Sequence, residues 1–206
     1  MHGAENNSFK KTLSIRVRTS LRSVVLLCIV ALSSQGMRFA GAQISADEYK
    51  VEAAFVFHFA QLVDWPSNAL DVRGESFNVC LLDVEPHRQE LQSTLEGKPI
   101  GSRTMHVRLL DKSQSAENCN ILFLSRNEGR RQDEFLRTLR GQPVLTIGDA
   151  DSFLTDGGII RFHLEQNKVR FDINAGAAES CHLKISSRLL LLATSVTYSG
   201  STRGGN

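Results

Sequence analysis

The sequence lacks the motifs of several large enzyme classes. Its 206 residues contain no G-x-S-x-G nucleophile elbow and no helical H-E-x-x-H zinc pair. The G-x-G-x-x-G rhythm of dinucleotide-binding folds is also missing. No interval between the later histidines is typical of a metal or acid–base pair: they are His58, His87, His106, His163 and His182. The sequence therefore supports neither an enzyme nor a bound cofactor or metal.

The first apolar run, Val24 to Leu32, is too short to span a bilayer. Five basic residues precede it: Lys10, Lys11, Arg16, Arg18 and Arg22. After it, Ala40-Gly41-Ala42 has the small-x-small pattern at which a signal peptidase cuts. We expect residues 1–42 to be a signal peptide, with a membrane anchor as the competing interpretation. Cys28 does not indicate a lipoprotein, because Leu27 is bulky where lipoprotein cleavage sites need a small residue.

Basic residues are in the minority once the expected signal peptide is removed. That segment holds six of the 24 Lys and Arg residues and one of the 22 Asp and Glu residues, so the remaining formal charge is 18 − 21 = −3. No basic cluster remains, which argues against nucleic-acid binding. The remaining length, without evident linkers or repeats, predicts one domain over residues 43–196 and a flexible Gly- and Ser-rich tail over 197–206.

Three cysteines follow the signal segment, and an exported protein enters a compartment where thiols oxidise. Cys80 lies in the apolar run 77–82, and Cys119 precedes the run 121–124. If these runs are neighbouring strands, the two Cβ atoms come within bonding reach. We therefore favour a Cys80–Cys119 disulfide. Cys181 is then a buried free thiol, with an intermolecular disulfide as the weaker alternative.

Apolar periodicity alternates between helix and strand along the domain. A capping box at residues 45–48 starts a helix with a broad apolar stripe that ends at Trp65-Pro66. Strands are then expected over 77–83, 105–110, 121–124 and 144–147, and helices over 86–95 and 127–140. This order predicts an α/β fold: a mostly parallel sheet with flanking helices, a Rossmann-like sandwich. In a last helix capped at Ser186-Ser187, residues 189–192 are apolar all round, which predicts a buried helix.

The most informative stretch is Val144 to Asn174, which predicts three short strands joined by two turns. After the first strand, apolar residues alternate with charged and polar ones on both sides of a turn at residues 165–168. The pattern predicts an antiparallel hairpin near the C-terminus with one apolar face and one charged face. The charged face carries Arg161, Arg170 and Asp172, and it is either solvated surface or a docking surface.

Four segments in order resemble the YfiR/HmsC family of periplasmic proteins. They are Phe59 to Trp65-Pro66, ILFLSRNE at 121–128, the stretch at 144–174, and ISSRLLLLA at 185–193, so the likeness spans residues 47–195. The resemblance implies a compact α/β domain, often dimeric, with no known catalytic activity. It also implies a stabilising Cys80–Cys119 disulfide, whereas a second disulfide of some members has no counterpart because Cys181 lacks a mate.

The resemblance further implies a regulatory role. Its best understood members bind the periplasmic domain of an inner-membrane diguanylate cyclase and hold it inactive, and an OmpA-like outer-membrane lipoprotein draws them away. Cyclic-di-GMP, exopolysaccharide and biofilm then increase. The candidate partner-binding residues are Trp65, Phe153, Arg161, Arg170 and Asp172, each of which has a structural alternative: core packing for the two aromatic residues and a solvated face for the charged ones. The competing function is a periplasmic small-molecule-binding module that signals to a sensor kinase or transporter.

Overall fold

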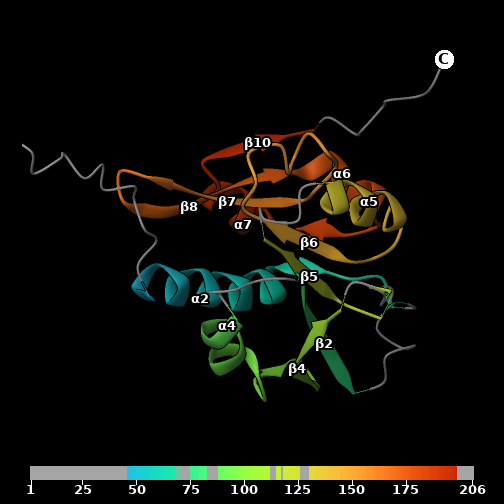
Figure 1. Cartoon of the computed structure of the whole chain (residues 1–206). Helices are drawn as coiled ribbons and strands as arrows, with labels where there is room; N and C mark the ends of the chain where they lie inside the picture. Colours follow the sequence, from blue (N-terminus) through green and yellow to red (C-terminus); the bar gives the residue numbers. More distant parts are fainter. Residues whose placement is uncertain are drawn as a thin grey trace, which may run out of the picture. The chain divides into compact units, whose positions relative to one another are not determined.

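The computed structural model of the chain describes residues 46–67, 69, 75–82, 88–111, 115–116, 118–125 and 130–198. The expected signal peptide and the tail after residue 198 lie outside these residues. Within the described part, helices and strands alternate along the chain and build one mixed α/β unit (Figure 1).

An eight-stranded sheet organises the unit, in the order β10-β8-β7-β6-β5-β2-β4-β3. Five neighbouring strands are parallel: β2 (Ser76–Leu82), β4 (Arg103–Leu110), β5 (Ile121–Leu124), β6 (Leu145–Gly148) and β7 (Ile160–Glu165). Their order β4-β2-β5-β6-β7 is that of doubly wound, flavodoxin-like sheets. The short β3 (Pro99–Ile100) is antiparallel to β4, and β8 (Lys168–Asn174) is antiparallel to β7. β10 (Ser195–Thr197) runs parallel to β8 at the end of the sheet. The predicted fold class is confirmed.

Helix α2 (Ala46–Leu62) covers one face of the sheet. Its buried positions recur at helical spacing, as in Ala53, Val56, Phe59 and Ala60. The ring of Phe59 meets that of Phe171 edge-on at 4.9 Å between centroids, which anchors the helix to the hairpin. α4 (Arg88–Leu95) lies beside α2 and adds its two buried leucines to the same core. Ser45, from the expected capping box, lies outside the described residues.

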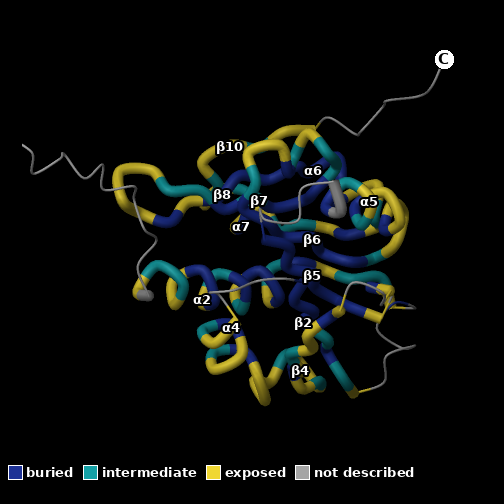
Figure 2. The backbone as a smooth tube through the Cα atoms, viewed as in Figure 1, coloured by how far each residue is buried: buried dark blue, intermediate teal, exposed yellow. Residues whose placement is uncertain are grey.

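The other face has a second, separate core. It is formed by α5 (Arg130–Thr138), by the turn after β6 and by the sheet residues that point away from α2. The central strands β5 and β6 are buried along their whole length, as expected of parallel strands covered on both sides (Figure 2). The sheet thus separates two apolar clusters, and the buried apolar residues of its central strands divide between them.

The predicted hairpin is present, and its turn is shorter than expected. β7 ends at Glu165 and β8 begins at Lys168, so Gln166 and Asn167 alone make the turn. Their φ angles are 50° and 58°, the pair of positive values that a two-residue type I′ turn requires. This turn fixes the register and places Arg161 directly opposite Asp172.

The C-terminal segment corrects one prediction. Ser186 caps α7 (Ser187–Leu192) as expected, its side chain accepting from the amide of Leu189. The expectation that residues 189–192 are buried all round is wrong, because Leu191 is 86% and Leu192 60% exposed. The helix has less than two turns, so Leu189 occupies its one buried position. The elements that pattern analysis missed are very short: α6 (Ala175–Ser180), β10, and β1 (Val63–Asp64) paired with β9 (Lys184–Ile185).

Candidate functional site

The charged face of the hairpin is organised around Asp172. Arg161 donates from Nη2 to Asp172 Oδ2 at 2.7 Å, and Ser195 donates from Oγ to Asp172 Oδ1 at 2.7 Å. His163 Nδ1 lies 3.3 Å from Oδ2, close enough for an ion pair when the imidazole is protonated but without hydrogen-bond alignment. Because these partners lie on β7 and β10, Asp172 ties three strands together.

Burial by itself raises the pKa of Asp172. The hydrogen bonds from Ser195 and Arg161, and the charges of His163 and Arg161, more than offset this and hold its pKa below the ordinary value of 3.8. Arg161 also donates from Nη1 to the carbonyl oxygen of Asp151 at 3.1 Å, which links the hairpin to the turn after β6. Arg161 and Asp172 are therefore an internal pair, with only the edge of the Arg161 side chain accessible.

Arg170 is the most exposed of the predicted contact residues on this face. Its Nε lies 3.8 Å from Glu165 Oε2, and both side chains are about half exposed. Such a pair holds its members only weakly and leaves them free to exchange partners. Of the three charged candidates, Arg170 has the most accessible charge.

Phe153 is a core residue. It is fully buried in the turn between β6 and β7, which joins two parallel strands without a helix. Its ring fits between Gly148 and Gly158 so closely that a Cβ atom on either glycine would overlap ring carbons. Asp156 fastens this turn to α5 by accepting from Ser152 Oγ at 2.6 Å and from Gln132 Nε2 at 3.2 Å. In this conformation Phe153 offers no surface to a partner.

Trp65 lies where α2 ends, and it is half-buried. Its indole meets the Phe77 ring edge-on at 5.1 Å. It lines a cavity of about 470 Å³ together with polar side chains from α2, β1, the β3–β4 turn and the start of β4: Gln61, Asp64, Ser102 and Arg103. This volume lies within the range of small-molecule sites, which span about 300–1,000 Å³. The lining thus combines two aromatic residues, Trp65 and Phe77, with polar side chains, a mixture suited to a ligand or an inserted side chain.

The five predicted contact residues do not form one site. Trp65 packs against the core beneath α2, whereas Phe153 belongs to the core on the opposite face. Arg161 and Asp172 alternate along their strands with Phe162 and Phe171, which face α2, so they also point to the opposite side. The sequence indicated the charged face but not Ser195, which joins Asp172 to β10, since nothing in the pattern signals that β10 exists.

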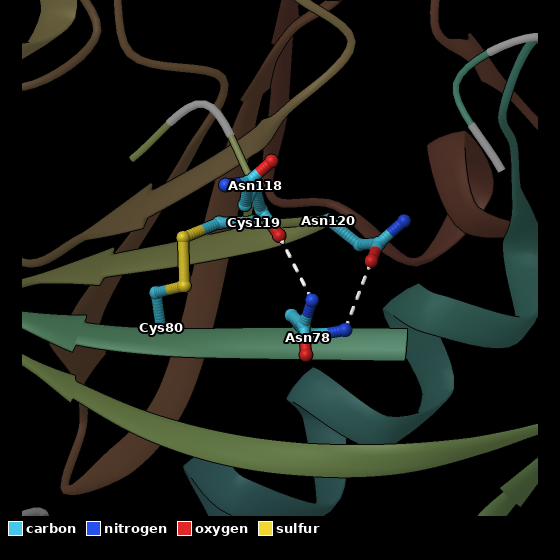
Figure 3. The surroundings of a disulfide bond; sticks show 5 residues. All are labelled: Asn78, Cys80, Asn118, Cys119 and Asn120. Carbon is cyan, nitrogen blue, oxygen red and sulfur yellow. Dashed lines mark hydrogen bonds between the residues drawn. A yellow bond between two sulfur atoms is a disulfide. The ribbon is translucent and has the colours of Figure 1, made fainter. Parts of the chain in front are cut away.

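The predicted Cys80–Cys119 disulfide is present, with 5.8 Å between the Cα atoms. β2 and β5 are neighbouring parallel strands, as that prediction required. Figure 3 shows the hydrogen bonds that close the same junction: Asn78 Nδ2 donates to the Asn118 carbonyl at 3.0 Å, and the Asn78 amide donates to Asn120 Oδ1 at 2.9 Å. The segment before β5 is thereby fixed to β2.

Cys181 is a free, partly buried thiol. It lines a small cavity of about 110 Å³ between α5 and α6. Burial raises the pKa of the thiol, and a backbone hydrogen bond from Gly141 offsets this only in part. The protonated thiol is a poor nucleophile.

In the described ranges, no group of three His, Cys, Asp or Glu residues is placed to hold a metal ion. Among the same residues, no helix has the length and apolar character needed to cross a membrane. The candidate residues provide surfaces for recognition: a cavity lined by Trp65 and Phe77 on one face and an accessible arginine, Arg170, on the other.

Comparison with known proteins gives one family. A family model described as YfiR/HmsC-like matches residues 49–194, which is well over half of the chain. The matched span contains the disulfide, the Trp65 cavity, and Asp172 with Arg161 and His163; Ser195 lies one residue beyond it. No curated protein matches the chain.

Proposed function

The chain belongs to the YfiR/HmsC-like family, which comprises periplasmic, non-catalytic regulators of cyclic-di-GMP signalling, and from this we propose that it binds and represses the periplasmic domain of an inner-membrane diguanylate cyclase. The match over residues 49–194 is the observation that carries the proposal. Repression lowers cyclic-di-GMP and biofilm formation. An OmpA-like outer-membrane lipoprotein that competes for the protein would relieve it.

A repressor of this kind needs no nucleophile. It must bind one conformation of its target more tightly than the other, since equal affinity for both shifts nothing. Moving a two-state enzyme almost completely from the active to the inactive form takes a preference of about 10⁴-fold, or about 5.5 kcal/mol. A few well-packed contacts can supply this, and aromatic and arginine side chains are the residues that most often do so.

Two of the predicted contact residues are accessible enough for this role. Trp65 borders a cavity that could receive an apolar side chain of the cyclase, and Arg170 presents a solvated charge on the hairpin. We assign target binding to the Trp65 side, because a cavity lined by two aromatic residues buries more apolar surface than a single exposed charge. Arg161 and Asp172 support the hairpin and do not contact the target directly.

Binding can be measured with purified components. The protein is titrated by calorimetry into the periplasmic domains of the cell's membrane diguanylate cyclases. One of them should bind in the micromolar range or tighter, and Trp65→Ala should weaken that binding at least tenfold. The matched control is Arg170→Gln, which should change the affinity less than twofold. If no cyclase domain binds, the proposed role is wrong. Binding that Trp65→Ala leaves intact rejects only the assignment of the surface.

The cavity beside Trp65 also favours a second candidate function, a periplasmic small-molecule-binding module that signals to a sensor kinase or transporter. A ligand that binds only the native state must raise its stability. In a thermal-shift screen of small metabolites, a Tm increase that disappears in Trp65→Ala supports this function. If no metabolite shifts Tm, the second candidate is rejected.

A further inference from the structure

The cavity beside Trp65 has two aromatic walls. The indole of Trp65 and the ring of Phe77 are nearly perpendicular, with 87° between their planes and 5.1 Å between their centroids, and both residues line the cavity. Phe77 is buried in β2, so the core holds this wall in place. Aromatic side chains placed around a cavity are the elements of the cages that bind quaternary ammonium groups.

Asp64 supplies a negative charge beside these rings. It directly precedes Trp65 in the chain, lines the same cavity and is exposed. Within the described ranges its carboxylate forms no hydrogen bond or ion pair, and Lys184, which lies opposite Asp64 in the β1–β9 pair, is not within ion-pair distance. The carboxylate is therefore available to a ligand.

The other polar side chains of the lining do not oppose a cation strongly. Arg103 is the basic residue among them, and it is already engaged in an interaction within the chain. Gln61 and Ser102 are uncharged. Over residues 43–206, acidic residues outnumber basic ones by 21 to 18, which favours the approach of cations. The charges around the cavity thus favour a cationic ligand over an anionic one.

We propose that this cavity binds a small organic cation of the quaternary ammonium class. The methyl groups of the cation contact the rings of Trp65 and Phe77, whose π faces attract positive charge, and the Asp64 carboxylate provides the counter-charge. A quaternary nitrogen has no N–H group, so aromatic contact replaces the hydrogen bonds that a primary ammonium group requires. The cavity volume of about 470 Å³ leaves room for the rest of the molecule.

The quaternary ammonium site rests on the second candidate function and names its ligand class. Repression of a cyclase does not require it. The choline titration described next contains no cyclase, and the calorimetric titration of the cyclase domains contains no choline. Failure of one experiment therefore leaves the result of the other standing.

The fluorescence of the protein reports on this cavity alone, because Trp65 is the single tryptophan of the chain. In a titration with choline chloride at constant ionic strength, the emission of Trp65 should change saturably, with a Kd of about 1 mM or tighter. The matched control ligand is 3,3-dimethyl-1-butanol, which has the shape of choline but carbon in place of the charged nitrogen. It should bind at least tenfold more weakly. No saturable change with choline, or equal binding of the two ligands, overturns the proposal.

A pair of variants tests the role of Asp64. Asp64→Asn should weaken choline binding at least tenfold and leave the Tm of the ligand-free protein unchanged, because the carboxylate is exposed. Asp133→Asn, the same change at a half-exposed position of α5, is the matched control and should leave choline binding unchanged. Saturating choline should raise the Tm of Asp133→Asn more than that of Asp64→Asn. If Asp64→Asn keeps the full affinity for choline, the proposed counter-charge is wrong.

A cationic side chain of a protein has similar chemistry, and the same assay distinguishes it. Butylammonium and propylguanidinium, which represent the side chains of lysine and arginine, are titrated in place of choline. Choline should bind at least tenfold more tightly than either of them. If either analogue binds as tightly as choline, the cavity does not select a quaternary ammonium ligand and the proposal is wrong.

Discussion

Arg161 and Asp172 form a direct cross-strand ion pair, with 2.7 Å between Arg161 Nη2 and Asp172 Oδ2. Their side chains are 24% and 7% exposed, so water screens the pair only in part. The pair joins the two strands of the hairpin, β7 and β8, and the hydrogen bond from Ser195 joins β8 to β10. The cluster thus joins the hairpin strands to β10 at the end of the sheet.

Replacing Asp172 by asparagine should destabilise the fold. The change leaves the largely buried Arg161 guanidinium without its counter-charge, and breaking a buried pair on one side costs about 3–5 kcal/mol. We expect about 2–3 kcal/mol here, because Arg161 keeps some solvent contact. Urea unfolding measures the loss. The control Arg170→Gln removes the solvated pair with Glu165 and should cost no more than about 0.5 kcal/mol.

The effect of Asp172→Asn should depend on pH in one direction. The folded pKa of Asp172 lies below the ordinary 3.8, so the carboxylate stabilises the fold fully above that value. This contribution is lost as the pH falls through the lower, folded pKa. The difference in unfolding free energy between wild type and variant should be constant at roughly pH 5–8 and shrink below about pH 4. A difference that grows on acidification would contradict this assignment.

Substitutions of Phe153 and Gly148 should have strongly non-additive effects on the unfolding free energy. Phe153→Ala leaves a cavity in a closed core and should cost about 3–5 kcal/mol. Gly148→Ala forces its Cβ into the Phe153 ring and should cost about 1–3 kcal/mol or more. The double variant removes the clash together with the ring, so its loss should be smaller than the sum of the single losses by about 0.5–3 kcal/mol. Additive losses in chemical unfolding would show that the two residues do not meet.

Removing the Cys80–Cys119 disulfide should lower the unfolding free energy. The bond joins residues 39 apart in the sequence. On the loop-entropy account, closing a loop of that length contributes roughly 4 kcal/mol. The Cys80→Ala/Cys119→Ala variant should lose about this amount and become insensitive to dithiothreitol, whereas the natural protein should lose stability when reduced. Equal stability of the oxidised and reduced forms would contradict a structural role.

The Cys181 thiol should react slowly near neutral pH. Burial raises its pKa, so its thiolate fraction at neutral pH is smaller than that of a free cysteine. The rate with 5,5′-dithiobis(2-nitrobenzoate) should remain low at neutral pH and keep rising with pH beyond the ordinary thiol pKa of 9.0. Fast reaction at neutral pH, as fast as for a small free thiol, would show that the site is open and the pKa not raised.

Much of this fold could be predicted from the sequence. Apolar runs of strand length and helical stripes identify the central strands, α2 and α5 because burial imposes those patterns over several residues. The register of the hairpin follows from its turn. Arg161 lies five residues before Gln166, and Asp172 lies five residues after Asn167. If Gln166 and Asn167 alone form the turn, Arg161 and Asp172 must lie opposite each other, where they can form the ion pair.

Other features could not be predicted. β3, β9 and β10 have two or three residues each, too few to show a period. β3 and β10 form on the edges of longer strands, and β9 pairs with the equally short β1. Four consecutive leucines cannot show that Leu191 and Leu192 are exposed, since only the packing of Leu189 sets the helix orientation. For the same reason the sequence grouped Trp65 with Phe153 and Arg161, which the sheet places on opposite faces.

The intracellular cyclic-di-GMP concentration tests the central claim most directly. It is compared in the parent strain, in a strain with this gene deleted, and in the deletion strain carrying the gene on a plasmid. Each strain is measured with and without the membrane cyclase whose periplasmic domain binds the protein. Repression predicts a rise of several-fold on deletion, its reversal by the plasmid, and no rise where the cyclase is absent. Unchanged cyclic-di-GMP on deletion, with the cyclase present and expressed, would contradict the account.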